Sequence, residues 1–371
     1  MSGPGEARRH PVAQPFGAAP GPDLDRRQFI AWFAFVLLIA AFLRFLFPAA
    51  DPPWESTVGI VWHDEGAWVH NARNKALFGA WSLDAWNPMF IAPVFTALEY
   101  ASFAIFGVGV RQARLVPELL GLVSVFLLGL GVARIAGRRA GLIAAALLAS
   151  NYVYVMWNRA ALMEGPMAAL MVASWYCYTR TGDSARWAWG AALLAFLAFF
   201  TKAAAAFFVA AIALDALITL AGNARRDPHQ RRAALAVIAA LAVCGFAALV
   251  VFVGPNWEDY WFYNVQMSIT RKPSYDIHSV LNRVTWFPIL HDIFTRMWLT
   301  LVLGLAAAVT VLLRFRSAAS GERLLVLWIA LGALELLAHD VGNERRFILF
   351  IPALTALAAI LLGRDRSLVS A

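Results

Sequence analysis

The chain has 371 residues, of which 61% are hydrophobic and only 15% are charged. One water-soluble core cannot bury that much apolar surface, so the composition excludes a soluble globular domain and indicates a polytopic membrane protein. The formal net charge of +8 does not indicate nucleic-acid binding, because the basic residues stand between apolar runs and do not cluster.

The order of apolar runs predicts the topology. Residues 1–29 are rich in Pro, Gly, Ala and Arg and are expected to form a disordered cytoplasmic tail. The run "FIAWFAFVLLIAAFLRFLF" is expected to remain as the first membrane helix, without cleavage of a leader. Further runs lie at 115–133, 140–157, 166–179, 187–200, 203–221, 233–253, 297–313, 323–338 and 346–363.

These runs predict an all-α polytopic protein with about ten transmembrane helices, since a helix needs about 20 residues to cross a bilayer. The membrane domain is expected over residues 30–365, followed by a cytoplasmic tail at 366–371. Another apolar run, "NPMFIAPVFTALEYASFAIFG", contains Pro88, Pro93 and Glu99 and could either cross the membrane or lie flat at its surface.

The basic residues favour the flat arrangement. If this run does not cross, 18 of the 31 basic residues fall on one side of the membrane, in the tails and short loops. Short Arg-rich loops mark the cytoplasm, so both termini are expected inside. Residues 48–114 and 254–296 then form two long external loops, the first of which carries interfacial helices.

Acidic residues gather on the predicted external side. A carboxylate at a membrane edge is costly unless it is paired or hydrated, so these residues are candidates for function. They are Asp64, Glu65, Glu164, Glu258, Asp259, Asp276, Asp292, Asp340 and Glu344.

Four stretches resemble a known family when taken in order. They are "HDEGAWVHNARNKALFGAW", "NRAALMEGP", "FLAFFTKAAAAFFV" and "NERRFILFIPALTALAA". They are similar to the GT-C class of polytopic, polyprenyl-phosphate-dependent glycosyltransferases, and within it to family 39, which contains protein O-mannosyltransferases and lipid A aminoarabinose transferases. The resemblance covers about residues 30–365 and implies the GT-C fold.

The resemblance also implies roles for individual residues. Asp64 matches the proposed catalytic base of the family, and Glu164 matches a second carboxylate after an Arg, where relatives often have Asp. Lys202 matches a lysine expected near the lipid phosphate, and Arg345 or Arg346 matches an arginine of the last external turn. Ile91 and Ala92 depart from the family, because many relatives carry a Glu-Lys pair there.

These residue types fit transfer of a sugar from a polyprenyl phosphate donor to a hydroxyl of a protein, lipid or cell-envelope glycan. A base such as Asp64 would take the acceptor proton as the anomeric carbon inverts. Lys202 and the two arginines would stabilise the leaving phosphate. Glu65 and Arg159 are expected to support the site, Arg159 by pairing with Glu164.

Each residue also has a structural interpretation. Asp64 is a good N-cap for a helix over 65–77, in which Glu65 favours the helix dipole. Glu164 could form only a surface ion pair, Lys202 could reach to the interface, and the two arginines could be membrane anchors.

No cofactor is expected. The external histidines, His63, His70, His291 and His339, lack the spacing of metal ligands, so no metal site is expected either.

The partners and location follow from this interpretation. We expect a polyprenyl-phosphate sugar donor, a hydroxyl acceptor and the lipid bilayer as partners, in a bacterial inner membrane with an extracytoplasmic active site. Aromatic residues of the second loop suit either the headgroup layer or sugar rings; they are Trp257, Tyr260, Trp261, Tyr263, Tyr275 and Trp286. The alternative is a non-enzymatic flippase or transporter for lipid-linked sugars, but no internal repeat is present and the charges gather at one face.

Overall fold

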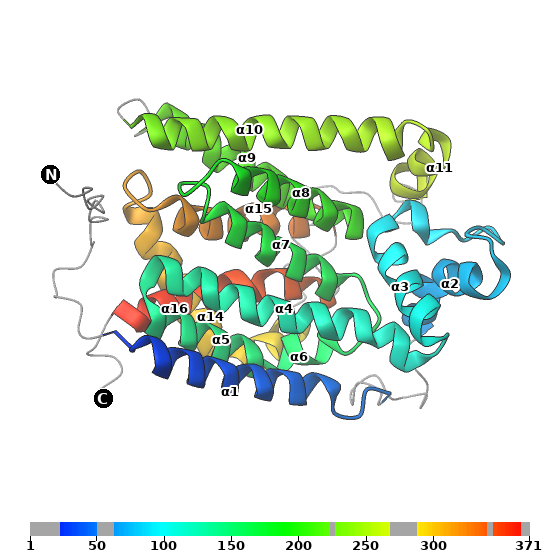
Figure 1. Ribbon diagram of the computed structural model, residues 1–371, viewed down its shortest axis with the longest axis horizontal. Coiled ribbons are helices and arrows are strands. Elements are labelled where there is room, and N and C mark those ends of the chain that lie inside the picture. Colours follow the sequence, from blue (N-terminus) through cyan, green and yellow to red (C-terminus); the bar gives the residue numbers. More distant parts are fainter. Residues whose placement is uncertain (1–22, 50–62, 223–226, 268–287, 340–343, 365–371) are drawn as a thin grey trace, which may run out of the picture.

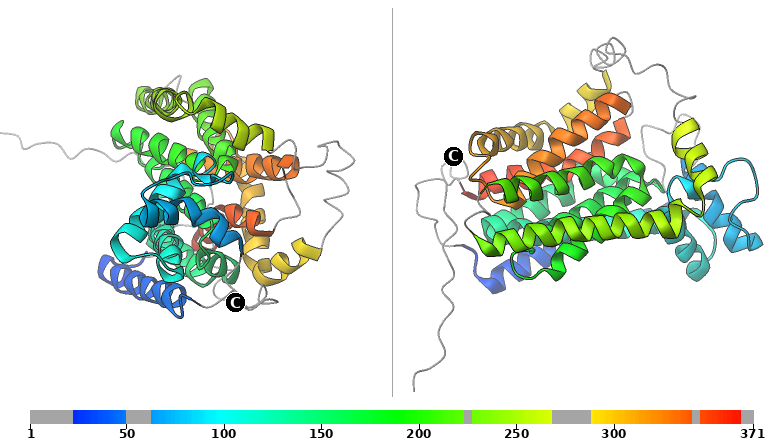
Figure 2. Two further views of the ribbon diagram at one scale, coloured as in Figure 1. Left: turned by 90° about the vertical axis from the view of Figure 1, so that its right-hand side faces the viewer. Right: turned by 90° about the horizontal axis from the view of Figure 1, so that it is seen from above.

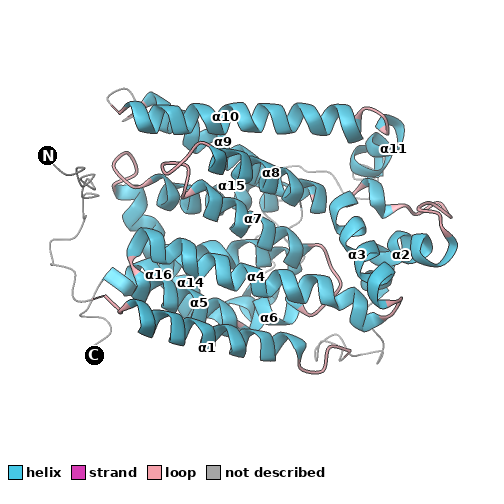
Figure 3. Ribbon diagram, viewed as in Figure 1, coloured by secondary structure: helices cyan, strands magenta, loops and turns pink. Residues whose placement is uncertain are grey.

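The computed structural model describes residues 23–49, 63–222, 227–267, 288–339 and 344–364. Within these ranges every regular element is a helix, as Figure 3 shows, which confirms the predicted all-α class. The long helices lie alongside one another in a single bundle (Figure 1). This is a helical membrane-protein architecture, in which each backbone hydrogen bond is made within its own segment.

Within the described ranges, five segments are long and apolar enough to cross a membrane. They are α1 (Arg26–Phe45), α4 (Val110–Ala136), η3 with α9 (Ala203–Ala221), α10 with η5 (Pro228–Val253) and the Arg296–Leu313 part of α14 (Pro288–Leu313). The other bundle helices are α7 (Glu164–Tyr178), α8 (Arg186–Thr201), α15 (Ser320–His339) and α16 (Ile351–Arg364), the last preceded by η7 (Glu344–Phe350). The count of about ten spans stays a prediction.

The apolar run predicted as one span at 140–157 is broken in two. It forms α5 (Arg138–Ser150) and α6 (Tyr152–Asn158), which are bent by 61°. The break falls at Asn151, whose side chain accepts a hydrogen bond from the Tyr154 amide at 2.9 Å and so caps α6. An Asn favours such a cap over a helix interior, which explains the break.

Acidic caps at one end of the bundle fix where helices begin. Asp25 accepts from the Gln28 amide at 2.8 Å and starts α1. Asp23 accepts from the amides of Arg138 and Arg139, at 2.9 and 3.0 Å, and therefore caps α5 from more than a hundred residues away. Gly137 separates α4 from α5 by a single residue and has φ of 94°, a conformation that glycine adopts without strain.

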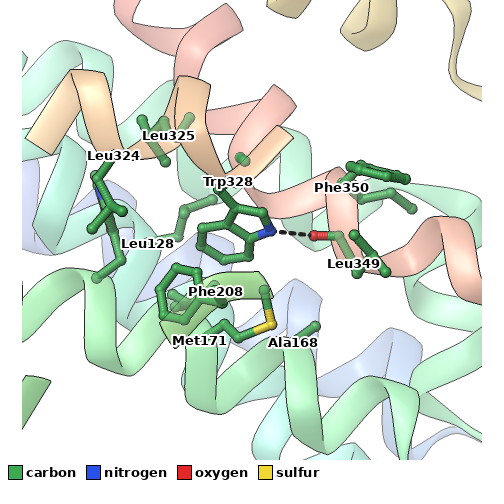
Figure 4. Close-up of a cluster of buried hydrophobic side chains, with 14 of the residues drawn as sticks. Leu128, Ala168, Met171, Phe208, Leu324, Leu325, Trp328, Leu349 and Phe350 are labelled. Atoms are coloured by element: carbon green, nitrogen blue, oxygen red, sulfur yellow. Dashed lines mark hydrogen bonds between the residues drawn. The ribbon is translucent and has the colours of Figure 1, made fainter. Parts of the chain in front are cut away.

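Small residues and buried aromatics hold the bundle together. A Cβ added at Gly141 would lie 2.5 Å from both Ala133 Cβ and Gly129 O, so α4 and α5 approach closely only because these residues are small. Figure 4 shows Trp328 of α15 packed edge-on against Phe208 of α9, with ring centroids 4.7 Å apart. The Trp328 indole also donates to the Leu349 carbonyl at 2.9 Å, which joins α15 to η7.

The run that could either cross or lie flat takes a place at one end of the bundle. It forms η2 (Pro88–Phe90) and α3 (Pro93–Phe106), which lie with α2 (His63–Phe78) beyond the ends of α7 and α8 (Figures 1 and 2). At the same end, α10 continues through η5 (Leu249–Val253) to α11 (Trp257–Trp261) and η6 (Phe262–Gln266), and η6 packs against η2. The described parts of the two predicted external loops therefore meet.

Candidate active site

The first turn of α2 carries two of the predicted site residues. The helix begins at His63, so Asp64 and Glu65 lie inside its first turn. The N-cap position predicted for Asp64 is therefore wrong: the helix starts earlier because both carboxylates are favourable in the first turn, beside the positive end of the dipole. Asp64 is half-buried and Glu65 is buried.

Glu65 is fixed by an ion pair with Arg114 of α4. The guanidinium donates twice, from Nε to Oε1 at 2.8 Å and from Nη2 to Oε2 at 2.7 Å. The amide of Ala161, between α6 and α7, donates to Oε1 at 2.6 Å. The supporting role predicted for Glu65 stays a prediction, but this one carboxylate joins α2, α4 and the segment that leads into α7.

Arg114 is a residue that sequence reasoning missed. It appeared only as one basic residue of the first external loop, although its side chain is fully buried. It also donates to the Pro48 carbonyl at 3.2 Å, so it ties the end of the first span to α2. The signal that could have identified it is its position at the start of an apolar helix, where an arginine needs an acidic partner.

Glu164 and Lys202 lie side by side. Glu164 is the first residue of α7, and Lys202 is the extended residue that ends α8. The Lys202 ammonium lies 2.5 Å from Glu164 Oε1, with the two side chains 13% and 3% exposed. The structure thus joins two site residues that stand 38 positions apart in the chain.

Arg159 has different partners from those expected. It donates to the carbonyls of Leu43 and Phe47, both at 2.9 Å, and so binds the carboxyl end of α1. The predicted pairing of Arg159 with Glu164 is wrong. Arg159 follows α6 and its side chain reaches α1, while Glu164 forms an ion pair with Lys202.

Two buried carboxyl groups near these pairs were also missed. Glu99 of α3 is fully buried, and neither of its carboxyl oxygens has a hydrogen-bond partner in the described part of the chain. Burial raises the pKa of Glu99 well above its ordinary value, and the charge of Glu65 raises it further. Glu118 of α4 is buried as well, and its Oε1 has no hydrogen-bond partner among the described residues. A single acid in an apolar helix was the available signal.

The remaining predicted residues are placed only in part. Arg345 and Arg346 fall within η7, which packs against α7, but their side chains lie outside what the structure describes. Tyr275 and Trp286 of the second loop also lie outside the described residues. Among the residues that are described, no group of His, Cys, Asp or Glu side chains gathers as a metal site.

The chain is similar to known proteins both in sequence and in fold. A sequence model of the dolichyl-phosphate-mannose-protein mannosyltransferase family matches residues 90–255. ArnT from Cupriavidus metallidurans, solved with bound undecaprenyl phosphate, has a TM-score of 0.61 and 18% identity over 91% of this chain and 60% of ArnT. This chain has the GT-C fold. The predicted resemblance to the GT-C class and its family 39 is confirmed.

A second GT-C structure is also similar. The Archaeoglobus fulgidus oligosaccharyltransferase, tethered with an acceptor peptide, has a TM-score of 0.58 and 15% identity over 91% of this chain and 49% of its own. No curated protein sequence matches the chain. The structural matches span about three fifths of the length of ArnT and about half of the length of the oligosaccharyltransferase. Together the matches show that the chain shares the GT-C fold with these two proteins.

The family match covers only part of the site. Residues 90–255 include Arg114, Glu164 and Lys202, whereas Asp64 and the η7 arginines lie outside this range. The roles of these residues are therefore argued from the geometry of this chain.

Proposed function

We propose that this protein is an integral membrane glycosyltransferase that moves a sugar from a polyprenyl-phosphate donor to a hydroxyl acceptor, with inversion at the anomeric carbon. The reaction takes place on the extracytoplasmic face, with both termini in the cytoplasm of a bacterial cell. Two relatives of this fold were solved with lipid phosphates: ArnT with undecaprenyl phosphate and an archaeal oligosaccharyltransferase with dolichol phosphate.

The observation that carries the proposal is the link between the two pairs of charged residues. Glu65, next to Asp64, accepts a hydrogen bond from the Ala161 amide. Ala161 stands three residues before Glu164, which binds Lys202. One short segment of backbone, residues 161–164, therefore holds Asp64 through its neighbour Glu65 and Lys202 through Glu164. This brings a carboxylate suited to act as base near a cation suited to bind phosphate, as a transfer reaction needs.

Asp64 is the general base in this proposal. Its neighbour Glu65 is held by three hydrogen bonds and is thus unsuited to take a proton. Asp64 is half-buried at the start of α2, where an acceptor hydroxyl can reach it. It removes the hydroxyl proton as the anomeric carbon gains oxocarbenium character, and the acceptor oxygen forms the new glycosidic bond.

Lys202 binds the phosphate that leaves. An ammonium group has three N–H donors, so Lys202 can bind Glu164 and still donate to a phosphate oxygen. Glu164 orients the ammonium, and Arg345 or Arg346 adds a second positive charge as negative charge grows on the phosphate. Arg159 supports the site by holding the end of α1.

The test is transfer of label in membranes that contain the protein. They are incubated with a panel of radiolabelled polyprenyl-phosphate sugars, and loss of label from the lipid is measured. Asp64→Asn removes the base without changing the size of the side chain, so we expect transfer to fall by about 100-fold or more. Asp183→Asn is the matched control, since Asp183 pairs with Arg134 at the other end of α4.

The outcomes are distinct. Transfer from one donor that is lost in Asp64→Asn and kept in Asp183→Asn supports the proposal. Substantial residual transfer by Asp64→Asn would remove Asp64 as the base. Absence of transfer from every donor, combined with movement of a labelled donor between leaflets, would overturn the enzyme in favour of a flippase.

A further inference from the structure

A chain of three polar side chains links the second external loop to α2. Asn71 of α2 donates from Nδ2 to Asn87 Oδ1 at 3.1 Å. Asn87, just before η2, donates from its own Nδ2 to the Tyr263 hydroxyl at 3.3 Å. Tyr263 of η6 then donates to the Ala85 carbonyl at 2.8 Å. We name these residues the Asn–Asn–Tyr chain.

Every donor in the Asn–Asn–Tyr chain is used. The second N–H of Asn71 binds the Trp81 carbonyl at 2.5 Å, and that of Asn87 binds the Asp84 carbonyl at 2.6 Å. Asn71 Oδ1 accepts from the Met89 amide at 3.2 Å, which fixes the orientation of the Asn71 amide. Asn71 is fully buried, so each bond that is lost leaves a polar group without water to replace it.

Tyr263 is also held by rings and backbone. Its ring stacks on Phe90 with centroids 5.6 Å apart and meets Trp86 edge-on at 6.3 Å. The next residue, Asn264, donates to the Phe90 carbonyl at 3.0 Å. Tyr263 thus joins a segment of the first loop from a position more than 170 residues away in the chain.

The same segment reaches the start of α2. The Trp86 indole donates to the Ala67 carbonyl at 3.2 Å, one turn from Asp64. Its ring also packs edge-on against Trp68 at 5.7 Å. The 81–90 segment therefore contacts α2 at two places, through Trp86 near the first turn and through Asn87 at Asn71. Tyr263 contacts both Trp86 and Asn87.

We propose that Tyr263 is a positioning residue for the transfer reaction, because through the Asn–Asn–Tyr chain and the Trp86 ring it fixes the part of α2 that carries Asp64. This inference rests on the proposed function. Tyr263 acts on the chemical step and not on donor binding, because it holds the helix of the base. In the described part of the chain its hydroxyl bonds to Asn87 and Ala85, and not to Lys202 or Glu164.

The variant that isolates this role is Tyr263→Phe. It keeps the ring between Phe90 and Trp86 but removes the hydroxyl that Asn87 and Ala85 bind. Small displacements of a reacting group are costly, so we expect kcat to fall by about tenfold and the KM for the donor to change by less than about twofold. The double variant Asn87→Ala/Tyr263→Phe should lose no more activity than Asn87→Ala, because the two residues act as one unit.

Tyr100→Phe is the matched control. Tyr100 lies on α3 and packs edge-on against Trp81 with centroids 5.0 Å apart, but its hydroxyl makes no hydrogen bond to a described residue. We expect this variant to keep the wild-type kcat. A purely structural Tyr263 would lower the amount of folded protein while kcat per folded molecule stays unchanged, and that result would overturn the inference.

Hydrogen exchange separates this inference from the proposed function. The amides of residues 67–71 should exchange faster in Tyr263→Phe than in the wild type and in Tyr100→Phe. Unchanged exchange in Tyr263→Phe, or additive losses in the double variant, would overturn the positioning role. If the wild-type protein transfers no sugar at all, the proposed function fails, while exchange still decides whether Tyr263 fixes α2.

Discussion

The Glu65 carboxylate and the Arg114 guanidinium form a buried ion pair with two parallel hydrogen bonds, 2.8 and 2.7 Å long. The pair joins α2 to α4, and its carboxylate also binds the Ala161 amide. A planar guanidinium matches a carboxylate in this geometry, whereas an ammonium does not. The pair is a buried polar connection between the helix of the proposed base and the bundle.

Breaking this pair should destabilise the protein. In Glu65→Gln the Arg114 charge stays buried without its counter-charge, and removal of one partner of a buried pair costs about 3–5 kcal/mol. Arg114→Lys should also be destabilising, because lysine keeps the charge but cannot form two parallel bonds. The measurement is thermal unfolding of the purified protein in detergent.

Arg111→Lys is the control for the Arg114 variant, since Arg111 is exposed one turn earlier on the same helix. It should unfold within a degree or so of the wild type, in keeping with the small effect of surface changes, about 0.5 kcal/mol or less. Equal melting temperatures for Glu65→Gln and the wild type would show that the pair does not hold α2 in place.

Lys202 gives a prediction about donor binding. Lys202→Met keeps the length of the side chain but removes its positive charge, so the KM for the lipid-linked donor should rise by about tenfold, the effect of about 1.4 kcal/mol. The same change at Lys75, which donates to the Gly79 carbonyl at the end of α2, serves as control. Donor titration of the two variants at equal amounts of folded protein makes the comparison. A KM that stays at the wild-type value in Lys202→Met would exclude a phosphate contact.

Composition and apolar runs predict much of the fold because a bilayer imposes length and hydropathy on each helix. The all-α class follows from this constraint, whereas the flat arrangement of the run that forms α3 was predicted from the distribution of basic residues. The bend at Asn151 does not, since it depends on one side chain that caps a backbone amide. Local hydrogen bonds of this kind compete with the helix and leave little trace in hydropathy.

The candidate site could be predicted as a set of residues but not as a set of pairs. Asp64, Glu164 and Lys202 stand out because charges are rare near apolar runs. Their partners depend on how the helices pack, so the sequence pointed to Arg159 beside Glu164, while the structure places Lys202 there. Arg114 and Glu99 were missed because burial of a charged side chain is a property of the packed helices.

The buried carboxyl of Glu99 gives a prediction about how stability depends on pH. Its carboxyl is fully buried in α3, outside the predicted spans, and neither oxygen has a hydrogen-bond partner in the described part of the chain. Of the charges on the helices around α3, Glu65 is engaged by Arg114, and Lys202 by Glu164. Burial and the negative charge of Glu65 therefore raise the pKa of Glu99 well above 4.5, so the folded protein keeps this carboxyl protonated to a higher pH than the unfolded chain does.

A raised pKa makes stability fall as pH rises. Below the ordinary pKa of 4.5 Glu99 is protonated in both the folded and the unfolded chain, so it adds no pH dependence. Above that value the unfolded chain loses the proton and the folded protein retains it, so the free energy of unfolding decreases until the raised pKa is passed.

Glu99→Gln removes this pH dependence with little change in the shape of the side chain. Thermal unfolding from pH 4 to 9 should show the variant gaining stability over the wild type as pH rises, whereas Glu258→Gln, at an exposed site on α11, should follow the wild-type curve. Parallel curves for Glu99→Gln and the wild type would mean that Glu99 is ionised in the folded protein, and a second cation near Glu65 would then be required.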